Sequence, residues 1–406
     1  MTQLAEGLIS ISYLSLIESG KRTAGGKLQR NLLERLSRLE NSAGLTQEFA
    51  EAAKEVTSAI EVGSPSGHIM EKMLPTNSSE RAEVRRLQGF QIERQGLDAE
   101  ALEIYKTVYN QIHIDPIVRI RAANGICRTS YATGQQDLIT RVFTEISNRF
   151  AEDPVSLSDD YMELRASAAN AFVELGDFAT AINLVTLTPE QAESVTPWQL
   201  CMFAWSASTF EEQLGNFTQA SVLTHRALSL AEILNRPRAI AALQINTAWI
   251  DLKTCPQNFE YIAELLDQAE NFFQRTGSLA ELAAAISTRA SMYALQGREL
   301  DATESFRQAF ELIPSSNVID IADIHLSAAE AYTSFGNSDF ALDHLQQATT
   351  ALKNVPESRT LARIWTKLGD IYSQLDQYDL AYECMKIATG MLGLKTPTQD
   401  PSVLLK

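Results

Sequence analysis

Histidines, serines and acidic residues are the side chains of this sequence that would first suggest catalysis or metal binding. The five histidines are His68, His113, His225, His325 and His344. No H-E-x-x-H and no G-x-S-x-G motif occurs, so their spacing supports neither a metal site nor a nucleophile. His325 and His344 fall on helices that are expected to pack together, where they could touch. The sequence therefore predicts no enzyme activity, no metal and no cofactor.

Glycines and a lysine between Gly20 and Lys27 have the residue types of a phosphate-binding loop. The spacing of G-x4-G-K-[S/T] fails by one residue, and Leu28 stands where a magnesium-binding hydroxyl is needed. We therefore expect no nucleotide there. The cysteines form no C-x-x-C pair and are expected to be small buried residues in a reducing compartment. They are Cys127, Cys201, Cys255 and Cys384.

Serine, leucine and basic residues follow one another in the stretch S-I-S-Y-L-S-L-I-E-S-G-K-R, residues 10–22. Ser10 can cap a helix over residues 11–19, and Gly20 can end it in a left-handed conformation. Leu14 and Ile17 would then face inward. The residues expected to face outward are Ile11, Ser12, Ser15 and Leu16. A second helix comes next, with one apolar stripe made of Leu28, Leu32, Leu33, Leu36 and Leu39.

This stretch resembles the Cro/C1-type (Xre) helix-turn-helix family through S-x-S-Y-L-S-x-I-E-x-G-K-R. The resemblance covers the recognition helix, its exit and the helix that follows, about a tenth of the chain. In that family the recognition helix lies in the major groove, and dimers bind paired half-sites. The resemblance implies that Ser12, Ser15 and Leu16 approach base edges of double-stranded DNA. It also implies that Lys21 and Arg22 approach phosphates.

The match departs from the family in three places. The first helix of the family is missing, because Met1 falls near the start of the second. Leu8 and Ala24 replace the usual glycine and proline. We expect either that the true start lies further upstream or that this copy is degenerate. The open alternative is that residues 1–40 are two amphipathic helices that cap the rest of the chain.

The clearest repeated pattern lies between residues 365 and 388. It has the form W-x2-L-G-x2-Y, then nine residues, then A-x3-Φ-x2-A with Φ apolar. Each half places its apolar residues on one stripe of a helix. Small residues such as Gly369 and Ala381 allow the two helices to approach closely. This pattern resembles the tetratricopeptide repeat.

Small residues at the position of Gly369 recur along the chain at steps of 38 to 43 residues. We call these residues the anchors. They are Gly89, Cys127, Ala169, Ser208, Thr247, Ala290, Ala329 and Gly369. Glycine follows most anchors by seven residues, where a left-handed turn between helices is expected. The unit at Thr247 has a longer connection, which contains Pro256. The pattern predicts about eight helix pairs stacked into a right-handed superhelix with a concave face.

In a tetratricopeptide unit, the residues three before, one after and four after the anchor point into the concave face. The positions expected to bind a peptide or protein there are Asn124, Arg128, Tyr131, Asn170, Trp205, Gln244, Glu330 and Asp370. An asparagine amide can donate to and accept from a peptide backbone at once. Trp205 and Tyr131 would supply apolar anchoring. The alternative for any one position is an ordinary solvated side chain.

Composition and charge limit the classes of partner. The net charge is −17, yet residues 1–40 carry +2, which leaves −19 for the rest. The excess of acid argues against nonspecific binding of nucleic acid or membrane by the whole chain. The asymmetry suggests two parts with different partners. No apolar run approaches the ~18 residues of a membrane span.

These observations predict an all-α chain with a partial helix-turn-helix domain (1–40), a helical linker (41–79), tetratricopeptide-like repeats (80–392) and a flexible tail (393–406). The two domains together resemble Gram-positive peptide-sensing regulators. That resemblance implies a cytoplasmic transcription factor that binds operator DNA as a homodimer and a short peptide in its groove. The main alternative is a tetratricopeptide interaction scaffold with a degenerate DNA-binding domain. A third, less favoured, is a member that acts on a phosphorylated response regulator.

Overall fold

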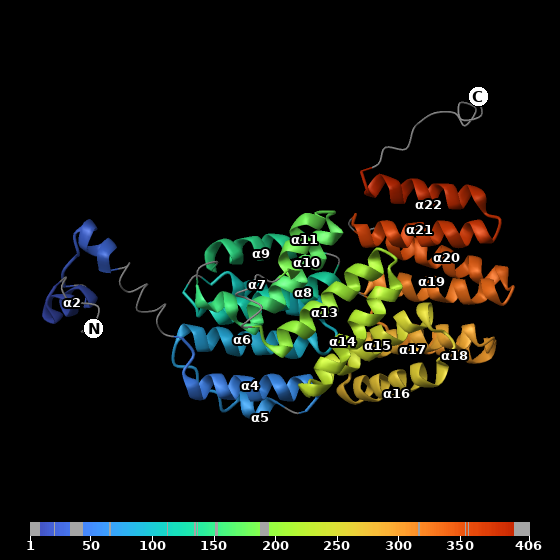
Figure 1. The fold of residues 1–406 in the computed structure, drawn as a ribbon. Helices are drawn as coiled ribbons and strands as arrows, with labels where there is room; N and C mark the ends of the chain where they lie inside the picture. The colour runs from blue at the N-terminus through green and yellow to red at the C-terminus, as the bar shows by residue number, and fades with distance from the viewer. Residues whose placement is uncertain are drawn as a thin grey trace.

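The computed structural model is helical throughout the part of the chain that it describes, with no strand in that part (Figure 1). The predicted all-α fold class is therefore confirmed. The described residues are 9–19, 21–32, 44–64, 66–111, 113–133, 135, 137–150, 153–186, 195–315, 317–353, 355 and 357–393. The predicted tail beyond residue 393 lies outside them.

Eight helix pairs follow one another in these described segments, and each first helix packs against its second. The pairs are α6 (Ser78–Glu93) with α7 (Asp98–Tyr109), α8 (Pro116–Ala132) with α9 (Asp137–Phe150), α10 (Asp159–Glu174) with α11 (Phe178–Val185), α13 (Pro197–Gln213) with α14 (Phe217–Ile233), α15 (Pro237–Thr254) with α16 (Phe259–Thr276), α17 (Leu279–Leu295) with α18 (Glu299–Leu312), α19 (Val318–Ser334) with α20 (Ser338–Leu352), and α21 (Arg359–Gln374) with α22 (Tyr378–Met391). A short 3-10 helix, Pro154–Leu157, precedes α10.

The anchors share one structural position, because every one of them is buried on the first helix of its pair. Gly369 shows why the position needs a small residue. A Cβ added there would lie 3.2 Å from the carbonyl oxygen of Ala381 and 3.1 Å from Met385 Cε. Contacts that close belong to two helices whose backbones approach across a small side chain.

The turn between the two helices of a pair uses a left-handed residue, as predicted. The glycines at this position have φ between +71° and +79°. They are Gly96, Gly176, Gly215, Gly297 and Gly336. In the last pair Asp376 takes the same place with φ of 59°. Gly134 lies outside the described residues.

Helix starts follow the local sequence. Thr196 and Gln199 form a capping box at the start of α13, and Pro197 occupies its first position, where a missing N–H costs nothing. The first repeat is capped by Asn77, whose side chain accepts the N–H of Glu80, so that α6 begins at Ser78. Asparagine is among the residue types preferred at this position.

Two helices lie directly before the first pair, α4 (Gln47–Glu61) and the short α5 (Gly67–Met70). Phe49, Val56 and Ile60 of α4 share a buried cluster with Leu87 and Phe90 of α6. Part of the segment expected to be a linker is thus packed on the first pair. The boundaries proposed from the sequence for the four parts of the chain (1–40, 41–79, 80–392 and 393–406) remain predictions.

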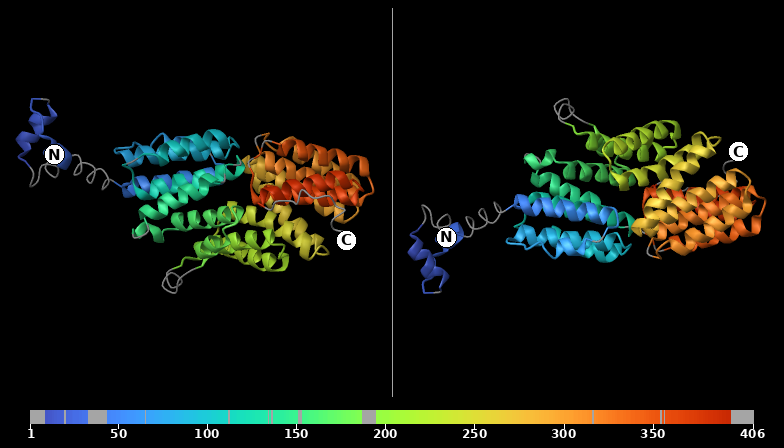
Figure 2. Two further views of the ribbon diagram at one scale, coloured as in Figure 1. Left: turned by 90° about the horizontal axis from the view of Figure 1, so that it is seen from above. Right: turned by 90° about the horizontal axis from the view of Figure 1, so that it is seen from below.

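The superhelix turns far enough for pairs distant in sequence to touch. A Cβ added to Gly63, after α4, would lie 2.7 Å from Thr276 Cα at the end of α16. The guanidinium of Arg359, at the start of α21, lies 5.0 Å from the ring centroid of Phe178 in α11. Figure 2 shows this arrangement, with the late helices beside the early ones. The concave face is therefore narrowed by contacts between successive turns.

The N-terminal part of the chain, which we call the front unit, contains α2 (Ile11–Glu18) and a second helix that begins at residue 26. Ser10 caps α2 by accepting the N–H of Tyr13 at 3.2 Å. Leu14 and Leu32 are buried against each other, with Ile17 packed beside them. The cap and the inward positions of Leu14 and Ile17 match the prediction. Gly20 and the leucines at 33, 36 and 39 lie outside the described residues.

Candidate functional site

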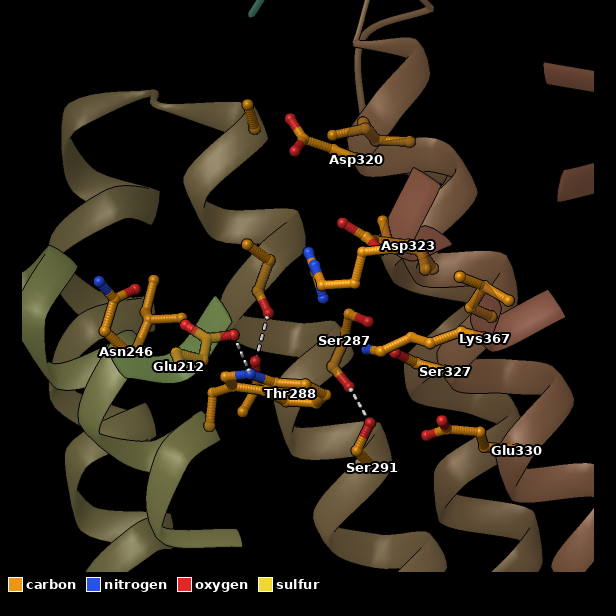
Figure 3. Close-up of a pocket in the computed structure, with 18 residues that line it drawn as sticks. Glu212, Asn246, Ser287, Thr288, Ser291, Asp320, Asp323, Ser327, Glu330 and Lys367 are labelled. Atoms are coloured by element: carbon orange, nitrogen blue, oxygen red, sulfur yellow. Dashed lines mark hydrogen bonds between the residues drawn. The ribbon is translucent and has the colours of Figure 1, made fainter. Parts of the chain in front are cut away.

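Two adjoining cavities open on the face formed by the first helices of the pairs. The smaller, of about 280 Å³, lies between α13, α15, α17, α19 and α21 (Figure 3). The larger, of about 520 Å³, is lined mainly from α6, α8, α10, α17 and α19. Ala280, Ala284 and Asp320 line both cavities. We call the continuous depression the inner groove.

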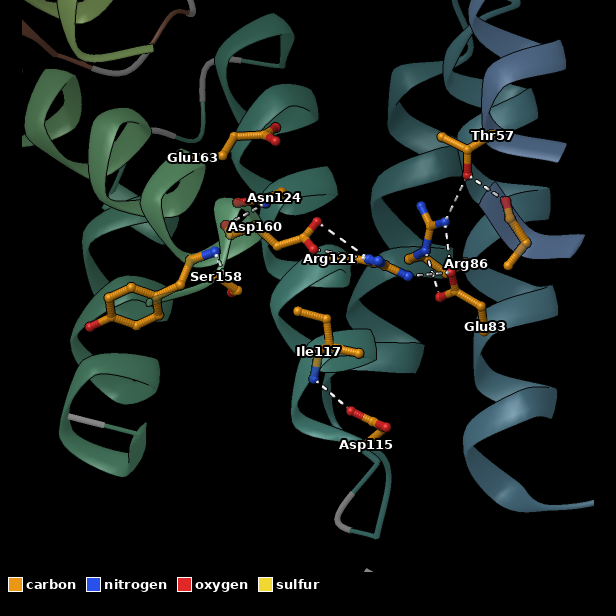
Figure 4. Close-up of polar contacts among 12 residues, drawn as sticks. Thr57, Glu83, Arg86, Asp115, Ile117, Arg121, Asn124, Ser158, Asp160 and Glu163 are labelled. Carbon is orange, nitrogen blue, oxygen red and sulfur yellow. Dashed lines mark hydrogen bonds and ion pairs between the residues drawn. The ribbon is translucent and has the colours of Figure 1, made fainter. Parts of the chain in front are cut away.

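The early part of the concave face is occupied by a network of internal ion pairs (Figure 4). Glu83 of α6 is fully buried and lies 2.8 Å from Arg86 and 3.2 Å from Arg121 of α8. Arg121 also lies 3.2 Å from Asp160 of α10. Burial opposes the ionisation of Glu83, but Arg86 and Arg121 outweigh it and lower its pKa. The network therefore ties three successive pairs together.

A second network lies one to three helical turns further along the same helices. Glu93 accepts the Tyr105 hydroxyl at 2.6 Å and Arg128 Nε at 2.8 Å, and it pairs with Arg94 at 2.7 Å. Arg128 also reaches Glu163 of α10 at 3.2 Å. Burial alone would raise the pKa of Glu93, but Arg128 and Arg94 lower it to about 2. These side chains already have partners inside the molecule.

Four of the eight predicted groove residues line the inner groove. Arg128, Tyr131 and Asn170 border the larger cavity, and Glu330 borders the smaller. Each also has an internal contact. The Tyr131 hydroxyl donates to the carbonyl of residue 167 at 3.3 Å, and Asn170 Oδ1 accepts the hydroxyl of Ser206 at 2.8 Å. Whether these residues bind a partner remains a prediction.

The other four do not border these two cavities. Asn124 is buried and donates to the carbonyl of residue 160 at 2.9 Å. Gln244 is also buried and donates to Gln268 at 2.6 Å. Trp205 packs beside the buried cluster of α13 to α17, and Asp370 is exposed on α21. For the first three, the fold supplies partners within the chain.

Several groove residues were missed because they lie nine residues before an anchor. They share that position and all line the larger cavity: Arg238, Glu281, Asp320 and Thr360. Nine residues at about 100° each place them on the side of the helix opposite the anchor, roughly 80° from the nearest predicted position, so they lie outside the predicted stripe. Arg238 donates to Ser278 at 2.9 Å and pairs with Glu281. A continuation of the predicted stripe toward the N-terminus of each first helix passes beside them, so helical periodicity alone gave no signal for them.

An indole and two cations line the smaller cavity, and a third cation, Lys253, lies beside the indole. Trp249 of α15 donates its ring N–H to Glu212 at 3.1 Å. The ammonium groups of Lys253 and Lys367 lie 4.6 Å and 5.4 Å from its ring centroid, within cation–π distance. Lys367 extends from α21 into the cavity (Figure 3). Burial and the neighbouring Arg363 lower the pKa of Lys367.

His325 and His344 do touch, with their Nδ1 atoms 2.9 Å apart. Phe310 packs on both rings. Burial, helped by the neighbouring His344, lowers the pKa of His325 to about 4, so the pair is neutral near pH 7. Within the described segments, no group of three or more His, Cys, Asp or Glu could hold a metal ion. In the same segments, no helix is both long and apolar enough to cross a bilayer.

The residues predicted to contact DNA lie on the exposed side of the front unit. Ser12, Ser15, Lys21 and Arg22 are exposed, and Leu16 keeps 38 % of its surface accessible. The guanidinium of Arg22 lies 5.4 Å from the Tyr13 ring centroid. This surface combines hydroxyls, an apolar side chain and two cations, which are residue types suited to the major groove.

Comparisons with known proteins agree with the fold. The family model described as "Tetratricopeptide repeat" matches residues 362–391, and no curated protein matches significantly. The solved Rap protein complexed with Competence and Sporulation Factor has a TM-score of 0.56 at 11 % identity, covering 86 % of this chain and 98 % of its own. BtubC from P. vanneervenii (TM-score 0.42, 17 % identity) covers 53 % of this chain and 89 % of its own. Apo NprR from B. thuringiensis (0.38, 12 %) covers 85 % and 99 %.

The match to the last repeat and the likeness to the Rap structure together define the class of protein. The chain is an all-helical protein with a tetratricopeptide repeat and a superhelix of the tetratricopeptide kind. At 11 % identity, the likeness to the Rap protein extends to the fold alone.

Proposed function

We propose that this chain is a regulator that binds a peptide segment in the inner groove and double-stranded DNA with its front unit. The observation that carries the proposal is the groove itself, two adjoining cavities lined mainly by the first helices of successive pairs, with both apolar and polar side chains. The Rap protein, which shares the fold, is complexed with Competence and Sporulation Factor. The sequence resemblance to peptide-sensing regulators supports the same assignment.

The groove has the chemistry that an extended peptide needs. A bound backbone must find partners for its N–H and C=O groups. Asn246, Ser287 and Ser327 line the smaller cavity and can provide them. Trp249 offers an aromatic face to an apolar side chain of the peptide. A groove binds a peptide noncovalently when it offers hydrogen-bond partners to the peptide backbone and apolar contacts to some of the peptide side chains.

Regulation of DNA binding by a peptide would follow from thermodynamic linkage between the two binding sites. A peptide changes DNA binding only if its affinity differs between DNA-competent and incompetent arrangements of the chain. The inner groove touches both early and late pairs, so a peptide there would change how successive turns of the superhelix contact each other. A homodimer with two front units would convert that change into altered binding of paired half-sites.

The DNA assignment is tested by the salt dependence of binding. Fluorescence anisotropy would measure the full chain against a mixed-sequence duplex between 50 and 200 mM salt, roughly the range over which phosphate contacts weaken steeply. Arg22→Ala is expected to weaken binding and to reduce the salt slope by about 1. Arg307→Ala, which removes the same charge from exposed α18, is the control and should leave the slope unchanged.

Ser12→Asp tests the recognition surface in the same assay. A carboxylate at this exposed position of α2 would face phosphates and base acceptors, so DNA binding should be lost while the helical circular dichroism is kept. Wild-type chain that binds no duplex, with its peptide binding intact, would favour the alternative of an interaction scaffold. An unchanged slope in Arg22→Ala would show that the phosphate assignment is wrong.

A further inference from the structure

Two cations on α21 line the smaller cavity without an ion-pair partner among the described residues. Arg363 and Lys367 are four residues apart and therefore lie on one face of the helix. No acid of the described segments comes within 4.0 Å of either, although such pairs are common elsewhere in the chain. The Nε of Arg363 is fully buried and has no hydrogen-bond acceptor in the described part of the molecule. Buried donors in proteins normally have a partner.

The acids around the cavity are mostly engaged elsewhere. Glu212 accepts the indole N–H of Trp249, and Glu330 lies 3.8 Å from Lys253. Asp320 accepts the side-chain amide of residue 317 at 3.1 Å. Asp323 of α19 is the remaining acid of the lining. Hydrogen bonds from neutral donors do not cancel the charges of Glu212 and Asp320, so the positive charge of the lining is confined to α21, where Arg363 and Lys367 lie.

We propose that Arg363 and Lys367 bind a carboxylate of the peptide, either its C-terminal carboxylate or an Asp or Glu side chain. This inference rests on the proposed function. A carboxylate can accept from a guanidinium through two parallel N–H···O bonds, and it would supply the acceptor that Arg363 Nε lacks. The ring of Trp249, 5.4 Å from the Lys367 ammonium, would cover the aliphatic part of the same residue.

The test uses three pools of random hexapeptides applied to the immobilised full chain, with retained peptide measured by mass spectrometry. One pool has free C-termini and lacks Asp and Glu. A second has amidated C-termini and contains Asp and Glu. The third is amidated and lacks both acids. We expect at least one carboxylate-bearing pool to be retained roughly tenfold more than the third, the scale of one charge-assisted bond.

The first two pools identify the source of the carboxylate, since preference for one of them assigns the chain terminus or a side chain. Lys367→Met and Arg363→Met should each abolish the preference, because methionine keeps the length of the side chain without its charge. Lys386→Met, at an exposed lysine of α22, removes the same charge and should keep the preference. Melting curves by circular dichroism verify that each variant is folded.

The outcomes separate the two proposals. Equal retention of all three pools by the wild-type chain would overturn the carboxylate site while leaving a peptide-binding groove. No retention of any pool would overturn the proposed peptide binding and the carboxylate site together. A preference that survives in both Arg363→Met and Lys367→Met would show that the carboxylate binds elsewhere.

Discussion

Charged side chains in this molecule differ in how completely the fold pairs them. Glu93 is buried among two arginines and a tyrosine hydroxyl, whereas Arg363 and Lys367 line a cavity and have no acid partner within the described part of the chain. A buried charge that loses its partner is costly, because water cannot replace the partner. The paired residues thus hold the early repeats together, whereas the two cations of α21 contribute no ion pair of this kind among the described residues.

Glu93→Gln should therefore destabilise the chain in a pH-dependent way. The pKa of Glu93 falls from 4.5 to about 2 in the folded state, so its contribution is present above pH 4.5 and lost as pH falls toward 2. We expect the free energy of unfolding to drop by about 3 kcal/mol at pH 7. The loss should shrink between pH 4.5 and pH 3.

Denaturant unfolding at pH 7 and at pH 3 measures both values. Glu103→Gln is the control, since Glu103 pairs with Lys106 on an exposed face of α7 and such pairs contribute little. If Glu93→Gln proves as mild as the control at pH 7, the buried network does not stabilise the early repeats.

At the level of elements, the distance between packed helices depends on a few glycines at which an added side chain would clash with the neighbouring helix. A Cβ added to Gly125 in α8 would lie 2.5 Å from the ring of Tyr105 in α7. Tyr105 is itself fully buried, and its hydroxyl is fixed on Glu93. The ring therefore cannot move aside without breaking that hydrogen bond.

Gly125→Ala should lower the free energy of unfolding by about 1–3 kcal/mol, the usual cost of overpacking. The expected effect opposes helix propensity, which favours alanine over glycine by about 1 kcal/mol. Gly390→Ala in α22 is the matched control, because nothing lies within 4 Å of its added Cβ, and it should be neutral or stabilising. Gly125→Ala should therefore melt at a lower temperature than Gly390→Ala, and equal shifts would contradict the packing argument.

At the scale of the whole molecule, contacts between turns of the superhelix set the width of the inner groove. Arg359 lies over the ring of Phe178 at 5.0 Å, and its guanidinium would clash with a Cβ on Gly176. α10 and α21 also touch directly. The early and late repeats thus form one closed unit even though nearly 200 residues separate Gly176 from Arg359.

Arg359→Ala should loosen this closure while leaving each pair intact. We expect a larger radius of gyration by small-angle X-ray scattering, unchanged helical circular dichroism and a loss of about 1 kcal/mol, as for one cation–π contact. Arg298→Ala is the control, because Arg298 lies over Tyr293 within a single pair. An unchanged radius in Arg359→Ala would mean that the turns are held together by other contacts.

The sequence by itself determined the helix pairs. The anchors from Gly89 to Gly369 and the left-handed glycines reflect local requirements, since a small residue is needed wherever two helices cross and a positive φ wherever a turn reverses the chain. The outward position of Ser12 and Ser15 likewise follows from helical periodicity. Each of these features depends on residues that are close in the chain.

Only the tertiary structure decided which groove residues are open to a ligand. Asn124 and Arg363 both face the concave side, yet the Asn124 amide N–H donates to the carbonyl of residue 160 in α10, whereas the Nε of Arg363 has no acceptor in the described segments. The difference arises from neighbours at least one repeat away, and from the turn of the superhelix that brings α21 opposite α15. Helical periodicity gives the direction in which a side chain points. Whether that side chain finds a hydrogen-bond or ion-pair partner depends on the residues that distant parts of the chain place next to it.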